Sequence, residues 1–229
     1  MQSEGRLKRR VTSHWVIMLT SIAEYISTHA SQIGGQIGAH IGISIFALIV
    51  AGIIGIPCGY MASKSEKAEA VISAPFEMLR VVPSLAFLIL LIPVMGTGLT
   101  PAVTALTILA VPPVLLNTIV GFRTIPDFMI ESARGIGMTD KEILYRVRFP
   151  AAMPMIMAGL RTALVEVVAS TTLAAKIGAG GLGEIIFTGL GLNRTDLLVL
   201  GGLLVAVLSL GSGLLFDALT RRLLRYKYV

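Results

Sequence analysis

Residues that could do chemistry are few in this chain, and they form no catalytic pattern. The three histidines, His14, His29 and His40, lie in the N-terminal region without the spacing of metal ligands. The single cysteine, Cys58, lies in an apolar run and offers neither a disulfide nor a thiolate metal site. The sequence has no phosphate-binding loop of the Gly-x4-Gly-Lys-Ser/Thr form. We therefore expect no catalytic, cofactor or metal site on this chain.

The densest set of polar groups lies in one segment, residues 122–150, which is too charged to sit in lipid. Gly135 and Gly137 permit a sharp reversal in its middle. Thr139, with Glu142 three residues later, fits the capping box that begins a second helix. The pattern predicts a helix–turn–helix knob of small residues, suited to docking into a cleft on another protein. Composition alone also permits an ordinary amphipathic loop.

The elements that flank this segment are predicted to cross a membrane. The chain has 229 residues, 14% charged, with a mean hydropathy of +0.83. A helix that crosses about 30 Å of hydrocarbon needs about 20 mostly apolar residues. The following segments meet this requirement: 37–61, 72–95, 101–121, 151–175 and 197–216. Gly96, Gly98 and Pro101 supply the turn that separates the second from the third.

The distribution of basic residues predicts the orientation. Lysines and arginines are enriched in cytoplasmic loops, which places segment 122–150 and the tail 218–229 in the cytoplasm. The loop with Lys64 and Lys67 follows on the same side. Residues 11–33 fit an amphipathic helix in the interface, or a sixth crossing that would better satisfy the basic N-terminus. We expect no removable targeting peptide.

Several residues inside the predicted spans are candidates for a pathway or a gate. Arg161 and Glu166 are too costly to face lipid, so they should face the protein interior or a wet cavity. Glu166 fits either the pathway of a cationic substrate or a bond to a neighbouring helix. Pro83 interrupts the second span, which makes Pro83 and Ser84 pathway candidates. The glycine-rich patch with Gly180 and Gly181 fits an external gate or a flexible surface loop.

The polar segment resembles the cytoplasmic signature of bacterial ATP-binding cassette (ABC) importer permeases. That signature runs Glu-Ala-Ala, three residues, Gly, nine residues, Ile-x-Leu-Pro. Glu131, Gly137 and Pro150 are in register with it, while Ser132 and Val147 replace an Ala and the Ile, and Phe149 replaces the Leu. The resemblance implies that the ATPase touches or is coupled through the following residues: Glu131, Ser132, Ala133, Arg134, Gly135, Gly137, Met138 and Pro150.

The same resemblance implies a fold and a division of the chain. The fold would be that of an all-α integral membrane protein with five to six transmembrane helices, of the MetI-like type I ABC importer permease class. Residues 1–35 would form an N-terminal amphipathic or membrane-entry helix, residues 36–217 the permease domain, and residues 218–229 a basic cytoplasmic tail.

Further motifs resemble one branch of these permeases, which imports compatible solutes such as glycine betaine, carnitine and choline. They are Pro83-Ser84-Leu85-Ala86, Gly135-Ile136-Gly137-Met138 and Ile177-Gly178-Ala179-Gly180-Gly181-Leu182-Gly183. This branch implies a non-catalytic subunit in the cell membrane, with ATP bound by a partner. The implied partners are an ABC ATPase dimer, a second permease copy or paralogue, an extracellular substrate-binding protein and membrane lipid, but no nucleic acid.

Other functions remain open at this point. A permease of the same class could import an amino acid or a similar small substrate. A secondary transporter would usually show paired inverted repeats or a ring of filter charges, and neither is evident in the sequence. A membrane enzyme would need a carboxylate dyad or metal ligands, which the spacing does not supply.

Overall fold

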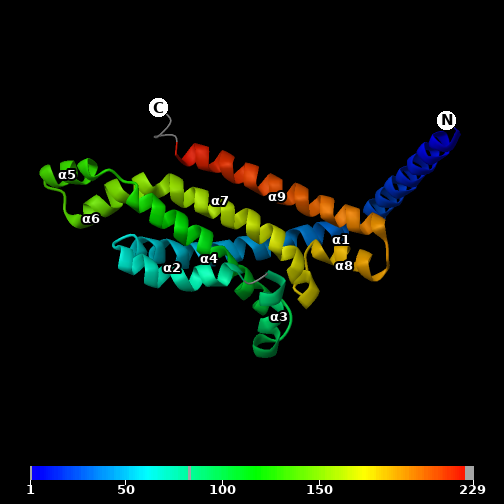
Figure 1. The fold of residues 1–229 in the computed structure, drawn as a ribbon, viewed down its shortest axis with the longest axis horizontal. Helices are drawn as coiled ribbons and strands as arrows, with labels where there is room; N and C mark the ends of the chain where they lie inside the picture. The colour runs from blue at the N-terminus through cyan, green and yellow to red at the C-terminus, as the bar shows by residue number, and fades with distance from the viewer. Residues whose placement is uncertain (1, 82–83, 225–229) are drawn as a thin grey trace.

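The computed structural model describes residues 2–81 and 84–224, with side chains for residues 15–79 and 84–224, and throughout these ranges every regular element is a helix (Figure 1). Four helices are long and apolar enough to cross a membrane, and a bent pair, α2 with α3, makes a fifth crossing if it counts as one. The elements are α1 (Gln2–Ala62), α2 (Glu66–Val81), α3 (Ser84–Met95), α4 (Leu99–Arg123), α5 (Asp127–Gly135), α6 (Asp140–Glu142), the π-helix η1 (Ile143–Arg148), α7 (Phe149–Ala174), the 3-10 helix η2 (Ala175–Ile177), α8 (Gly183–Gly191) and α9 (Thr195–Leu223).

Helix α1 is 61 residues long and contains both the first predicted span and the N-terminal segment 11–33. Its one non-helical position is His29, with φ −116° and ψ 20°, where the helix kinks. The part before this kink diverges from the bundle (Figure 1). Because α1 does not turn back between Gln2 and Ala62, residues 11–33 form no crossing that returns beside the first span. The placement of residues 1–35 as a separate segment in the interface stays a prediction.

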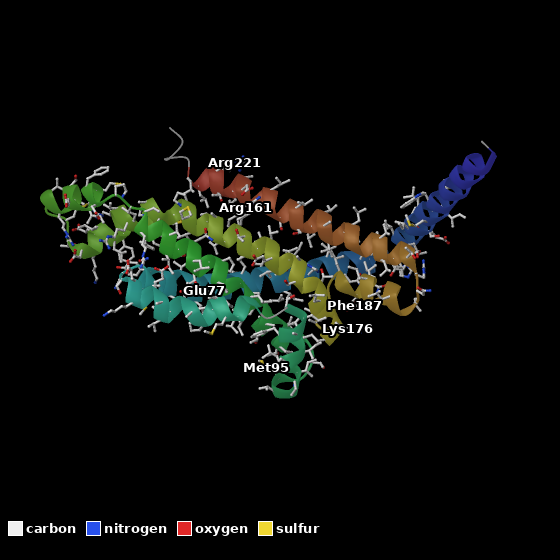
Figure 2. The ribbon with its side chains drawn as sticks, viewed as in Figure 1. Glu77, Met95, Arg161, Lys176, Phe187 and Arg221 are labelled. Carbon is white, nitrogen blue, oxygen red and sulfur yellow. The ribbon has the colours of Figure 1, made fainter. Side chains whose placement is uncertain are left out.

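The predicted span 72–95, in which Pro83 is expected to favour a break, is bent in the structure and is one crossing only if the bent pair counts as one. The segment forms α2 and α3, whose axes differ by 91°. Proline removes a backbone hydrogen bond and so favours a break, although Pro57, Pro75 and Pro154 lie within continuous helices. Pro83 itself lies outside the described residues. Helix α3 projects sideways from the bundle with Met95 near its tip (Figure 2).

Helix α4 is the centre of the bundle and is buried along most of its length. Glycines of the neighbouring helices let their backbones come close to it, as small residues do between membrane helices. A Cβ built on Gly59 of α1 would lie 2.6 Å from Thr118 Cβ, and one built on Gly159 of α7 would lie 2.8 Å from Asn117 Cβ. The bundle is therefore held by close packing of α1 and α7 on α4.

The predicted cytoplasmic segments lie at one end of the bundle. The corner between α1 and α2, the segment from α5 to η1 and the end of α9 all lie there, whereas α8 and the start of α9 lie at the opposite end (Figure 1). At this end an ion pair between Arg123 and Glu69 joins α4 to α2. We call this end the basic end and the opposite end the outer end. The arrangement agrees with the orientation that the basic residues predict.

Candidate coupling elbow and translocation face

The polar segment folds into a helix–turn–helix, which we call the elbow, residues 126–148. Helix α5 ends in a turn in which Gly137 N–H donates to Arg134 O at 2.9 Å and Met138 N–H donates to Ala133 O at 3.1 Å. Gly137 has a φ of +86°, a conformation that glycine adopts at little cost. The reversal is thus the one that the sequence predicts, and it depends on Gly137; Gly135, the last residue of α5, has no positive φ.

The second helix of the elbow begins with the predicted capping box. Thr139 N–H and the Thr139 hydroxyl donate to Glu142 Oε2 at 3.0 and 2.9 Å, and Glu142 N–H donates to Thr139 Oγ1 at 3.4 Å. The backbone hydrogen bond first, and the hydroxyl next, hold the pKa of the Glu142 carboxyl below its ordinary value. These bonds therefore stabilise the elbow above the ordinary glutamate pKa, and this stabilisation is lost as the pH falls through the lower pKa of the folded elbow.

Replacing Thr139 with valine should loosen the second helix of the elbow. The substitution keeps the shape but removes the hydroxyl of the cap, and losing such a cap costs about 1 kcal/mol. Hydrogen exchange of the amides at 139–143 should rise in the membrane-embedded protein. Thr124→Val is the matched control, because the Thr124 hydroxyl bonds only to carbonyls of its own helix end. Equal exchange in the two variants would show that the cap does not hold this helix.

The tip of the elbow presents a surface rather than a packed interior. Glu131, Ser132 and Gly137 are exposed, and Ile136 is 79% exposed. Exposed apolar side chains beside polar ones are typical of a protein interface. Ala133 differs from its neighbours because it is 5% exposed, so its part is to pack the turn.

The elbow also contains ion pairs and continues into the membrane helices. Arg134 lies 3.4 Å from Asp140 across the turn, and Glu142 lies 3.8 Å from Arg146. From Asp140 the chain stays helical through η1 into α7, so the elbow and α7 form a continuous lever. Phe149 and Pro150 stand at its first α-helical turn. A movement of the tip would be passed to the bundle through α7.

Arg161 on α7 has a partner that the sequence does not reveal. Arg161 Nε lies 2.6 Å from Asp217 Oδ1 on α9 (Figure 2 shows Arg161 between these helices). Asp217 follows directly after the last apolar span, 197–216, and nothing in the spacing indicates which helix faces α9. The pair explains how an arginine is tolerated on a membrane helix.

Glu166 lies on a different face of α7 and is exposed on the surface of the single chain. Ala158, Thr162 and Ala169 are exposed on the same helix at three- and four-residue spacing, so a small and polar face surrounds this carboxylate. Small and polar residues are typical of the surfaces by which membrane helices pack on one another. This face therefore suits contact with a further membrane helix.

The glycine patch lies at the outer end, and Gly181 within it is packed against α1. Gly181 is buried, with a φ of +90°, and a Cβ built on it would lie 3.1 Å from His40 Nδ1. Gly180 also has a positive φ of +86° and is half-buried. Of the other gate candidates, Ser84 begins α3 and is half-buried, while Pro83 lies outside the described residues.

This chain is similar to proteins of a known family. The profile of the family described as binding-protein-dependent transport system inner membrane component matches residues 51–225. The chain is 42% identical over 168 residues to the carnitine transport permease protein OpuCB of Listeria monocytogenes, covering 73% of this chain and 77% of that protein. It is 34% identical to the choline transport system permease protein OpuBB of Bacillus subtilis (strain 168), covering 82% and 87%.

A solved structure has the same fold. In inward-facing conformations of the MetNI methionine ABC transporter, one chain matches with a TM-score of 0.69 at 22% identity, covering 83% of this chain and 97% of that chain. This likeness supports the MetI-like permease fold that the elbow motif predicts.

Proposed function

We propose that this chain, which belongs to the family of inner membrane components of binding-protein-dependent transport systems, imports a small quaternary ammonium solute. Glycine betaine, carnitine and choline are solutes of this kind. As a permease subunit it is a multi-pass protein of the cell membrane and contributes helices to a translocation pathway.

The proposed solute rests on the relatives. Permease proteins for carnitine, for choline and for glycine betaine, carnitine and choline are 33–42% identical to this chain over 73–84% of its length. A quaternary ammonium group favours aromatic rings or a carboxylate. Aromatic residues make up only 6% of this chain, so we assign most of the recognition to an external binding protein. Glu166 is the carboxylate that would meet the cation in the pathway.

The proposed partners follow from the elbow and from the exposed face of α7. An ABC ATPase dimer would bind the elbow and supply all ATP chemistry, so that this chain has no catalytic role and binds no cofactor. A second copy or a paralogue would cover the face around Glu166. The single observation that carries this assignment is the exposed, glycine-hinged elbow that continues directly into α7.

Uptake by a reconstituted complex tests the proposal. The chain would be placed in proteoliposomes with its ATPase and binding protein, and radiolabelled betaine, carnitine and choline would be offered in turn. We expect uptake that requires ATP and is independent of ion gradients, with at least one of these solutes transported. Uptake of amino acids but none of these solutes would contradict the proposed solute and support an amino-acid permease of the same class. Gradient-driven uptake without the ATPase would support a secondary transporter instead.

A further inference from the structure

A fully buried histidine joins three helical segments at the outer end. His40 of α1 is 0% exposed, and its Nε2 lies 2.8 Å from Val168 O of α7. Leu182 N–H, in the turn before α8, donates to His40 Nδ1 at 3.2 Å. Because the carbonyl only accepts and the amide only donates, the ring is assigned as neutral, with its proton on Nε2. Both ring nitrogens are thus used to hold other segments.

The turn at 178–183, whose Leu182 bonds His40, packs closely against the neighbouring helices. A Cβ on Gly183 would lie 2.0 Å from Thr172 O, so only glycine permits this contact between the turn and α7. Gly98 N–H, at the corner before α4, donates to Ile177 O at 2.7 Å and ties that corner to the same region. The turn therefore joins α1, α4 and α7 in one closed arrangement.

Polar contacts on both sides extend this arrangement. Gln36, one helical turn before His40, donates to Glu184 Oε2 of α8 at 2.8 Å. Lys176 of η2 lies 5.3 Å over the Phe187 ring of α8, at the outer end (Figure 2). Ser44, one turn after His40, lies 3.0 Å from the Thr171 hydroxyl of α7. His40 is the one of these α1 residues that bonds both α7 and the turn.

We propose that His40 is the positioning residue of the outer gate: it latches the turn 178–183 and α8 against α1 and α7, and this latch must open for solute to enter. The inference rests on the proposed import function. Its physical basis is that His40 bonds Val168 of α7, the helix that begins at the elbow. A movement that starts at the elbow therefore reaches the latch through one continuous helix. The latch would translate that movement into opening of the outer end.

The test compares His40→Leu with His40→Gln in the reconstituted complex. Leucine removes both hydrogen bonds, whereas the glutamine amide can donate to Val168 O and accept from Leu182 N–H. Spin labels at Ile41→Cys and Leu190→Cys, both exposed positions, in a Cys58→Ser background would report the separation of α1 and α8. The second measurement is the ratio of ATP hydrolysis with and without the solute-loaded binding protein.

His40→Leu should raise the fraction of complexes with separated labels about fivefold to tenfold, because the loss of a hydrogen bond shifts a two-state equilibrium by about that factor. The ratio of ATP hydrolysis with and without the loaded binding protein should fall by a similar factor. His40→Gln should restore both values. A folded His40→Leu complex with wild-type label distances and hydrolysis ratio would overturn the latch. A wild-type complex that does not transport would reject the import function instead.

A glycine pair provides a second test that leaves His40 in place. Gly181→Ala presses a Cβ onto the ring and should open the turn, whereas Gly178→Ala, at a similar φ of +83°, meets no atom within 4 Å. We expect increased label separation in the first variant only. Equal behaviour of the two variants would overturn the proposal. So would failure of both His40→Leu and Gly181→Ala to fold, since His40 would then serve folding rather than gating.

Discussion

Replacing Gly137 with aspartate should lower solute uptake about a hundredfold, the loss expected when a central contact of an interface is disrupted, while the chain still inserts in the membrane. Two effects combine at this position. Any side chain there is strained because φ is +86°, and the aspartate adds bulk and charge to an exposed tip that must enter a cleft on the ATPase. Uptake in proteoliposomes and co-purification with the ATPase would measure the effect.

Gly135 supplies the matched control for the backbone part of this effect. Both glycines are exposed and neither has an atom within 4 Å of a built Cβ, but only Gly137 has a positive φ. Gly135→Ala should therefore leave the fold of the elbow intact, whereas Gly137→Ala should weaken ATPase binding. Glu131→Lys, a charge reversal on the same exposed surface, should act like Gly137→Asp. Normal uptake by Gly137→Asp with its ATPase would remove the elbow from the docking surface.

The elbow could be predicted closely because its determinants are local. The hydrogen bonds of the capping box join residues three apart, and the reversal depends on the backbone conformation of one residue, Gly137. Both features can therefore be predicted from the local sequence. That the basic segments share one end of the bundle could also be predicted, because the count of basic residues does not depend on how the helices pack. Which side of the membrane this end faces stays a prediction. The existence of a break near Pro83 follows from proline chemistry, but its direction does not. That direction is set by how α3 packs on α4.

Contacts between distant helices could not be predicted. The latch joins His40 to Val168 and Leu182 through backbone groups, and every residue carries such groups, so no motif marks the partners. The three histidines lack the spacing of metal ligands, so the sequence pattern alone gives His40 no role. The signal that could have found His40 is its polarity within an apolar span, where such residues need partners. The partner of Asp217 is hidden for a related reason, because no local pattern indicates that α7 lies beside α9.

Removing Arg161 alone should destabilise the protein, and removing its partner as well should restore it. Arg161→Leu leaves the Asp217 carboxylate beside apolar helices without its ion pair, which should lower the free energy of unfolding by about 2 kcal/mol. The cost is smaller than for a fully buried pair because the Arg161 side chain is 47% exposed in the single chain. The double variant Arg161→Leu/Asp217→Leu removes both charges and should recover most of the lost stability. Thermal unfolding in nanodiscs would measure both changes.

The transport activity of the same variants assigns Arg161 and Glu166 to different tasks. If Arg161 serves to join α7 to α9, the double variant should fold and transport like the wild type. Glu166→Gln, which removes a charge on the exposed face of α7 and keeps the size of the side chain, should slow uptake of a cationic solute. A double variant that folds but does not transport would instead place Arg161 in the pathway.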